Sequence, residues 1–160
     1  MPSSPSAAPS ARSAYVPLNP DYEKRVRESF ARQGAMRLFG ARLVEIRPGF
    51  CSIELPYRTD LTQQHGYVHA GVVAAIVDSA GGYAGFTLFP EDASVLTVEY
   101  KLNLLAPAAG ERLVAQGEVV KPGRTLTITR GEVFAEAQGK RTLCAIMQQT
   151  LIVLSGKPDA

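Results

Sequence analysis

The segment from about His69 to Phe89 is the feature that most constrains the fold of this chain. Its apolar residues surround the helix axis on every side: Val72, Val73, Ala74, Ala75, Ile76, Val77, Ala80 and Ala84. A helix that is apolar all round is either buried by its own protein or spans a membrane. Although it has about the length that a bilayer requires, it is rich in Gly and Ala, carries Asp78 at its centre and has no flanking Lys or Arg. An Asp at mid-membrane costs roughly 3 kcal/mol, so we predict a helix buried inside a soluble protein.

Strand-like segments before and after this helix supply the surface that would bury it. Two precede it and are joined by a turn at Pro48-Gly49, and four follow it with short connections: Ala41–Arg47, Phe50–Leu55, Ser94–Leu105, Arg112–Lys121, Arg124–Ala137 and Arg141–Leu154. Short connections make consecutive strands antiparallel neighbours. We therefore predict an α+β fold in which one curved antiparallel sheet wraps around the helix.

The chain before the first strand divides into two parts. Met1 to about Pro17 is made of Ser, Ala and Pro with one Arg, which predicts a disordered tail rather than a targeting segment. Asn19-Pro20 then opens an amphipathic helix, with Tyr22, Val26 and Phe30 on one face and Gly40 at the end of the segment. Residues 18–157 are expected to form a single domain.

Composition excludes several classes of partner. The chain has 17 basic and 15 acidic residues, a net charge of +2, which does not support binding to nucleic acid or to a membrane surface. Cys51 and Cys144 form no CxxC motif, so neither a disulfide framework nor a zinc module is expected, and a reduced, cytoplasmic setting fits best. His65 and His69 lie four residues apart, but Gly66 stands between them and the chain has no third His, so no metal site is predicted.

Asp78 needs an explanation because its helix is otherwise apolar. Its neighbours at three and four residues are Ala and Gly, so no cation shares its turn. An apolar setting raises the pKa of a carboxylate, which suits a general base or a nucleophile. The alternative is a structural Asp that is satisfied by backbone donors or by a neighbouring strand.

The start of the same helix is a second candidate. At His69-Ala70-Gly71, free backbone N–H groups and small side chains would let a carbonyl oxygen approach, which is how an oxyanion site is built without a charged side chain. The alternative is that small residues serve only close packing. Ala70 and Asp78 are eight residues apart, about 12 Å along a helix, so one carbonyl cannot contact both in the same chain. If both act in one reaction, a two-fold dimer with antiparallel helices must share each site.

These residues resemble the hotdog-fold acyl-CoA thioesterases of the phenylacetate-degradation (PaaI-like) type. The resemblance rests on the stretch Gln63 to Gly71 followed by Asp78, and on Val98-Glu99-Tyr100-Lys101, Leu105-Ala106-Pro107-Ala108 and Gly123-Arg124-Thr125. It covers about Leu43 to Val153. It implies a dimer that often pairs again into a tetramer, and hydrolysis of an acyl-CoA thioester without a cofactor, since CoA is part of the substrate.

The resemblance also implies roles for individual residues. Asp78 matches the catalytic carboxylate and Thr97 matches a hydroxyl that holds the attacking water, both from one subunit. Gln63, where the family has Asn, and Ala70, where it usually has Gly, would come from the other subunit, with Gly71 beside them. Val68 and His69 would contact the substrate, and His69 would also orient the turn.

Three residues at a predicted turn between strands are candidates for binding the CoA phosphates. They are Lys121, Gly123 and Arg124, of which Arg can hold a phosphate bidentately. The alternative is an ordinary exposed hairpin. For the whole chain two other functions stay open: a non-catalytic acyl-CoA-binding protein, and a hotdog dehydratase or hydratase that acts on an acyl thioester.

Overall fold

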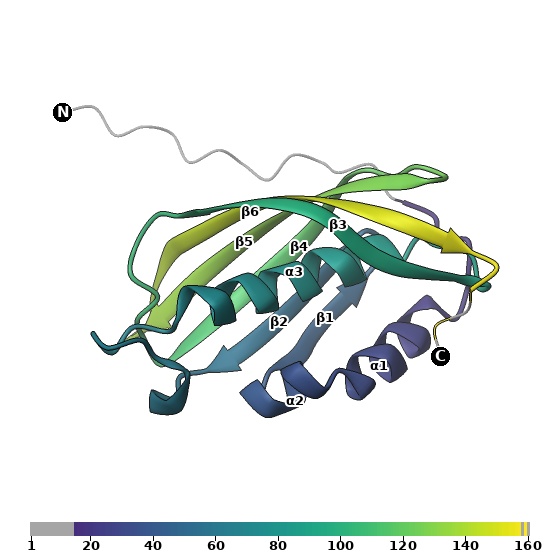
Figure 1. The fold of residues 1–160 in the computed structure, drawn as a ribbon. Helices are drawn as coiled ribbons and strands as arrows, with labels where there is room; N and C mark the ends of the chain where they lie inside the picture. Colours follow the sequence, from purple (N-terminus) through teal and green to yellow (C-terminus); the bar gives the residue numbers. More distant parts are fainter. Residues whose placement is uncertain (1–14, 158, 160) are drawn as a thin grey trace.

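Helix α3 (Ala70–Phe86) runs along the concave face of one six-stranded antiparallel sheet (Figure 1). The computed structural model of the chain describes residues 15–157 and residue 159. The sheet has the order β1-β2-β4-β5-β6-β3 and consists of β1 (Arg42–Arg47), β2 (Phe50–Pro56), β3 (Ala93–Leu104), β4 (Arg112–Lys121), β5 (Leu126–Ala137) and β6 (Lys140–Ser155). The predicted α+β architecture, a curved sheet around a long buried helix, is confirmed.

One expectation about the sheet is wrong. β3 and β4 follow each other in sequence but are not neighbours, because β3 pairs with β6 at one edge while β4 pairs with β2 and β5. The backbone N–H of Leu105, just after β3, donates to Cys144 O on β6 at 2.8 Å, before the chain crosses to β4. This crossing lets the sheet cover α3 from both sides with strands drawn from both halves of the chain.

The helix sits unusually close to the sheet because two strands carry glycine beneath it. A Cβ at Gly117 of β4 would overlap the backbone of Ala80, and a Cβ at Gly131 of β5 would overlap the side chain of Val77. Ile76, Val77, Ala80 and Ala84 of α3 are consequently fully buried. Cys51 is also fully buried, and burial raises the pKa of its thiol to about 12, so it is a core residue.

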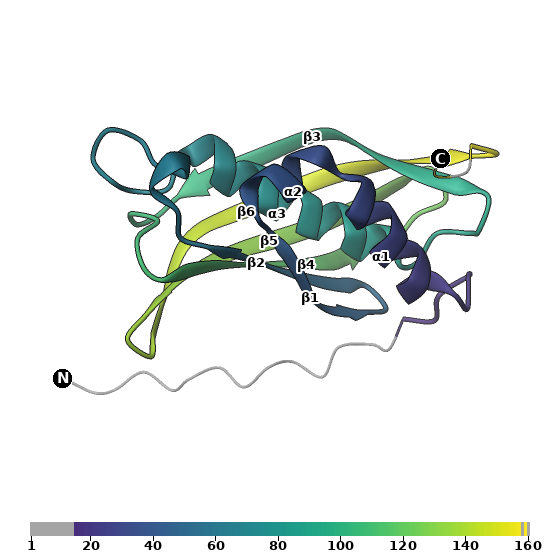
Figure 2. The same ribbon diagram turned by 90° about the horizontal axis from the view of Figure 1, so that it is seen from below.

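The N-terminal helical region differs from the prediction in two ways. The helix begins at Tyr22, because Asn19 Oδ1 accepts a hydrogen bond from the N–H of Asp21 at 2.9 Å and holds the preceding turn. It does not run on to Gly40: Gln33, with φ −68° and ψ 100°, separates α1 (Tyr22–Arg32) from α2 (Gly34–Phe39). Figure 2 shows α1 and α2 beside α3, where α1 contacts both α3 and β1.

The predicted disordered tail falls mostly outside the described residues. Its last three residues lie within them, and the Tyr15 hydroxyl donates to Val119 O at 3.3 Å. The Tyr15 side chain therefore packs against the folded domain, although it precedes residue 18. Among the described residues, no helix combines the length and the apolar character needed to cross a membrane.

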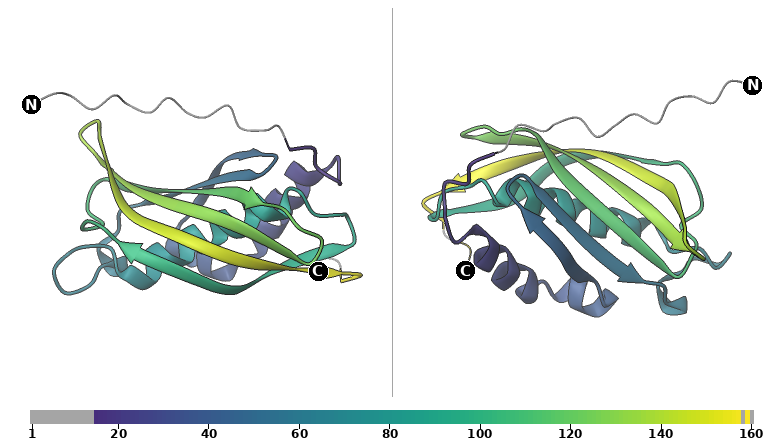
Figure 3. Two further views of the ribbon diagram at one scale, coloured as in Figure 1. Left: turned by 90° about the horizontal axis from the view of Figure 1, so that it is seen from above. Right: turned by 180° about the vertical axis from the view of Figure 1, so that it is seen from behind.

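Figure 3 shows the convex face of the sheet. A ladder of alternating charges lies on this face, at one end of the strands. One residue from each of five strands takes part: Arg42, Glu54, Arg112, Glu136 and Arg141. The closest N···O distances along the ladder are 2.5, 3.0, 2.7 and 3.6 Å. This face is therefore polar where it meets solvent.

Candidate active site

Asp78 lies half-buried in the middle of α3, where it faces β3 and β6. Its Oδ1 accepts a hydrogen bond from Thr97 Oγ1 on β3 at 2.8 Å and one from Gln149 Nε2 on β6 at 2.5 Å. Within the described chain no hydrogen bond reaches Oδ2. One carboxylate oxygen is thus held by the protein, while the other is available for chemistry.

Burial is the main influence on the acidity of Asp78. Desolvation raises the pKa of its carboxyl above the ordinary value, and the hydrogen bonds from Thr97 and Gln149 oppose that rise. No charged side chain among the described residues shifts this pKa. The absence of a countercharge distinguishes Asp78 from the paired carboxylates of the convex face, and it leaves a partly desolvated base.

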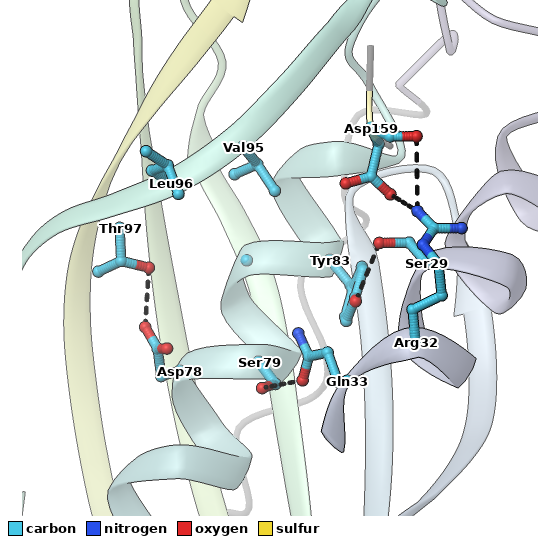
Figure 4. Close-up of a pocket in the computed structure, with 11 residues that line it drawn as sticks. Ser29, Arg32, Gln33, Asp78, Ser79, Tyr83, Val95, Leu96, Thr97 and Asp159 are labelled. Atoms are coloured by element: carbon cyan, nitrogen blue, oxygen red, sulfur yellow. Dashed lines mark hydrogen bonds and ion pairs between the residues drawn. The ribbon is translucent and has the colours of Figure 1, made fainter. Parts of the chain in front are cut away.

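A cavity of about 380 Å³ opens beside Asp78 (Figure 4). Its walls come from α3, from β3, from the end of α1 and from the C-terminal segment, and its residues are Ser29, Arg32, Gln33, Asp78, Ser79, Gly82, Tyr83, Val95, Leu96, Thr97 and Asp159. The structure places the end of α1 on the wall of this cavity.

Neutral hydrogen-bonding groups line the α1 side of the cavity. Ser79 Oγ donates to Gln33 Oε1 at 3.2 Å, and the hydroxyls of Ser29 and Tyr83 lie 3.1 Å apart. At the mouth, Arg32 pairs with Asp159 at 2.5 Å. An acyl group in this cavity would meet polar walls rather than a purely aliphatic surface.

The start of α3 contains one free N–H group rather than two. His69 is the N-cap, and its Nδ1 accepts from the N–H of Gly71 at 2.9 Å, which supports the expectation that His69 orients the turn. Gly71 is therefore already engaged. The N–H of Ala70 has no partner among the described residues, and Ala70 is exposed. It is the donor that a carbonyl oxygen could use.

Gln63 and Val68 belong to the loop that leads to α3 and do not contact Asp78. Gln63 Oε1 accepts from the N–H of His65, and its backbone N–H donates to Tyr67 O at 2.8 Å, so the residue stabilises its own loop. Val68 is 4% exposed and packs in the core, and its N–H donates to Ala108 O at 3.0 Å. Neither lies near Asp78 within one chain, as the helix-length argument requires.

Lys121 is the last residue of β4, and Gly123 and Arg124 lie on the exposed connection between β4 and β5. Gly123 and Arg124 line a different cavity, of about 400 Å³, together with Leu88, Phe89 and Pro90 beyond the C-terminal end of α3. Within one chain they are therefore not part of the Asp78 site, and they lie at the opposite end of α3 from Ala70.

Sequence reasoning missed Gln149, the second donor to Asp78. Gln149 is 2% exposed and stands between Met147 and Leu151 on the inward face of β6. A polar residue at an inward position of an alternating strand is a signal that could have found it. Within the described chain, no three His, Cys, Asp or Glu side chains are grouped so that they could hold a metal ion.

The architecture and the carboxylate in the central helix define a class of protein, the hotdog enzymes. Residues 65–142 match the model of the thioesterase superfamily. The structure superposes with a TM-score of 0.83 on a thioesterase family protein from Silicibacter pomeroyi, which is 50% identical, over 84% of this chain and 99% of that one.

Two further similarities agree with this assignment. Human acyl-coenzyme A thioesterase 13 is 29% identical over 99 residues, which cover 61% of this chain and 70% of that protein. The E. coli PaaI protein from the phenylacetic acid degradation operon is 17% identical and shares the fold, with a TM-score of 0.76 over 88% of this chain and 98% of that one. The chain belongs to the thioesterase superfamily and has the PaaI-like hotdog fold, and its thioesterase relatives support a thioester hydrolase.

Proposed function

We propose that this protein hydrolyses an acyl-CoA thioester to the free acid and CoA, with Asp78 as general base or nucleophile. The observation that carries the proposal is the Asp78 carboxylate itself: half-buried, without a countercharge, held at Oδ1 and open at Oδ2 beside a cavity. The similarity to a protein named acyl-coenzyme A thioesterase supports CoA as the thiol carrier.

Two routes use this carboxylate. As a general base, Asp78 Oδ2 would take a proton from water while the water oxygen attacks the thioester carbonyl; the C–S bond then breaks and the thiolate of CoA takes up a proton. As a nucleophile, Asp78 would form a mixed anhydride and release CoA, after which water would hydrolyse the anhydride. Mass spectrometry of an acid-quenched single turnover distinguishes them, since only the second route acylates Asp78.

The carbonyl needs a donor that this chain cannot bring to its own Asp78. The free N–H of Ala70 lies at the start of α3, about 12 Å along the helix from Asp78. A second copy with an antiparallel helix would place its Ala70 near Asp78, and the proposed site is therefore shared by two subunits. His69, Gly71 and Gln63 would shape the donor loop of that second subunit.

The edge strand β3 supports this arrangement. It is 12 residues long and has no strand on its outer side within the described chain. Four of its apolar or aromatic side chains are each at least 50% exposed: Leu96, Val98, Tyr100 and Leu104. A long apolar edge is a template for pairing with another chain. Because β3 also carries Thr97, pairing there would bring the partner to the cavity. We propose that two copies form a dimer through β3 and α3. Analytical ultracentrifugation would show whether two dimers pair again into a tetramer.

Thiol release from a panel of short, medium, long and aromatic acyl-CoA substrates tests the reaction. We expect turnover of at least one substrate, and a fall in kcat on the order of 100-fold or more in Asp78→Asn. The matched control is Asp92→Asn, the same change at an exposed position in the turn before β3. Full turnover by Asp78→Asn would refute the assigned role.

The same panel separates the two other functions. Tight acyl-CoA binding without thiol release would indicate a binding protein. Hydration of an enoyl-CoA, seen as loss of the conjugated thioester absorbance without thiol release, would indicate a hydratase. The described cavity has no His beside Asp78 to form the acid–base pair that such chemistry uses, which favours hydrolysis.

A further inference from the structure

β6 places one amide, Gln149, inside an otherwise apolar inward face, and the proposed hydrolysis does not yet give it a role. Burying an amide costs free energy unless its polar atoms find partners. Gln149 lies between the buried residues Met147 and Leu151, where an apolar side chain would pack at no such cost. The presence of an amide at this buried position points to a role for its hydrogen bonds.

The polar atoms of Gln149 are directed at Asp78 from one end and held from the other. Nε2 donates to Asp78 Oδ1 at 2.5 Å, and it also lies 3.1 Å from Asp78 O and 2.8 Å from Thr97 Oγ1. Oε1 accepts from the Thr129 hydroxyl at 2.8 Å, and Thr129 is fully buried on β5. Since both oxygens of Asp78 that face the amide are acceptors, only the amino end of Gln149 can face them.

The fold makes room for this amide at a specific place. A Cβ at Gly81 of α3 would overlap Gln149 Oε1 and crowd Thr129 Oγ1. The helix can therefore approach β5 and β6 closely enough for Gln149 to reach the Asp78 carboxylate only because residue 81 has no side chain. Three elements, α3, β5 and β6, are matched around one amide.

We propose that Gln149 is a positioning residue for the proposed hydrolysis. Its amide fixes Oδ1 of Asp78 so that Oδ2 points at the cavity, and Thr129 keeps the amide in that orientation. The inference rests on the proposed function and adds to it a residue that acts through Asp78 without touching the substrate.

A positioned carboxylate gains in two ways. A base that is displaced by about 1 Å can lose on the order of 100-fold in rate, so restricting rotation of the Asp78 carboxyl preserves kcat. A donor on Oδ1 also favours the ionised form, which lowers the pKa of Asp78 against the opposing effect of burial.

The surroundings of Asp78 contain few groups that could imitate these effects. The cavity holds Tyr83 of α3, Arg32 of α1 and Asp159. On β3, the Glu99 carboxylate accepts a hydrogen bond from Thr150 Oγ1 at 3.0 Å. Thr150 follows Gln149 on β6, so its side chain and the Glu99 carboxylate lie on the face of the sheet away from Asp78. On β5, Arg130 pairs with Glu132 on the face opposite Thr129. Thr97 and Gln149 are therefore the two described groups whose loss would change the acidity of Asp78 directly, and of these only Gln149 lies away from the cavity wall.

The test compares Gln149→Met with Gln148→Met. Met has nearly the size of Gln but donates no hydrogen bond, and Gln148 is the exposed neighbour on the same strand. For Gln149→Met we expect kcat to fall about 10- to 100-fold with KM nearly unchanged. We also expect the acidic limb of the kcat/KM profile to move to higher pH. Gln148→Met should match the wild type in all three.

The double variant with Thr129→Val separates positioning from general damage to the core. Thr129→Val keeps the side-chain shape and removes the hydroxyl that orients the amide, so it should lower kcat several-fold. If Thr129 acts only through Gln149, the double variant should be no slower than Gln149→Met alone. Additive losses, or a fall in kcat without movement of the acidic limb, would overturn the inference. If Gln149→Met does not fold, as judged by circular dichroism, Thr129→Val carries the same pH test.

A second readout does not depend on activity. The Asp78 carboxyl carbon can be titrated by ¹³C NMR in the wild type and in the variants, and its pKa should be higher in Gln149→Met. An unchanged titration would refute the inference even if the enzyme were slow. If the wild type releases no thiol from any thioester, the proposed function fails on its own. If it does so through Asp78 but Gln149→Met has the wild-type profile, only the positioning role fails.

Discussion

The two edges of the sheet are built in opposite ways. β1 has six residues and charged side chains along its length, and it is contacted by α1. β3 has 12 residues, and its exposed side chains include Leu96, Val98 and Tyr100. Both strands have one register shift, so the difference between the edges lies in length, charge and cover, which are devices that protect an edge from pairing. The chain thus protects one edge and leaves the other suitable for a partner.

The candidate site lies on the side of the unprotected edge. Thr97 belongs to β3, Gln149 belongs to its neighbour β6, and both hold Asp78. The β1 side supplies burial for α3 and the ladder of charges. One half of the sheet is therefore scaffold, while the other half holds Asp78 and carries the proposed dimer contact. Each prediction below tests this division.

The largest effect is expected when positive charges are introduced on the exposed apolar edge strand β3. Val98→Lys combined with Leu104→Lys would bring like charges together across a two-fold axis, so the dimer should dissociate and activity should fall at least about 100-fold. Analytical ultracentrifugation and thiol release over a dilution series measure both. The control is Val44→Lys at the exposed position of β1, which should change neither. A fully active monomer would refute the shared site.

Next in size is the loss of the Thr97 hydroxyl. Thr97→Val removes one donor to Asp78 Oδ1 while it keeps the shape of the side chain, so kcat should fall on the order of 10-fold. The acidic limb of the pH profile should also move to higher pH, because the lost donor favoured the ionised form. Thr150→Val on β6, which loses only a bond to Glu99, is the matched control. Equal losses in both variants would argue against a specific role for Thr97.

A smaller effect concerns stability and pH. Burial raises the folded-state pKa of Asp78 above its unfolded value. The protonated carboxyl therefore contributes to the free energy of unfolding at low pH, and this contribution is lost as the pH rises through the raised pKa. Asn cannot ionise. Asp78→Asn should therefore have a Tm at pH 7 equal to or above that of the wild type, and the difference should shrink as the pH is lowered toward 4. A Tm well below wild type at pH 7 would show that the carboxylate stabilises the fold.

The smallest effect belongs to the scaffold side. Arg112 bridges Glu54 and Glu136 at the surface, and Arg112→Gln should lower the free energy of unfolding only slightly, with kcat unchanged, because exposed ion pairs contribute little to stability. High salt should reduce the difference from the wild type, because exposed charges are screened. Urea unfolding at two salt concentrations measures it. A clear loss of activity would place chemistry on the side of the sheet that we regard as scaffold.

Features that depend on neighbouring residues could be predicted from the sequence, whereas features that depend on residues far apart in the sequence could not. The hydrophobic pattern predicts α3, and local turn signals such as Pro48-Gly49 predict strand ends, because both depend on neighbouring residues. The position of β3 beside β6 depends on pairing between residues about 50 apart, as in Thr97 with Leu151, and no local signal encodes it. The same limit applied to the long N-terminal helix, whose break at Gln33 has no Pro or capping motif of its own.

The candidate site divides in the same way. Asp78 could be found from the sequence because it is a charged residue in an otherwise apolar helix. Thr97 was predicted only through the family resemblance, which rests on the motif around His69. Gln149 was missed because a single Gln in a long strand is ordinary unless one knows that its face is buried. The engagement of the Gly71 N–H by His69 was also hidden, because it depends on the rotamer of the capping side chain.

Gln33, at the break between α1 and α2, differs from the groups that hold Asp78 in what its substitution would alter. Gln33 reaches the cavity from a segment outside the sheet, while Asp78 is held by groups on α3, β3, β5 and β6 that are fitted to one another at Gly81. A substitution at Gln33 alters one wall of the cavity without disturbing those fitted contacts. Under the proposed function, substitutions in the first helices would therefore change which acyl groups the cavity accepts, while the groups that hold Asp78 stay the same.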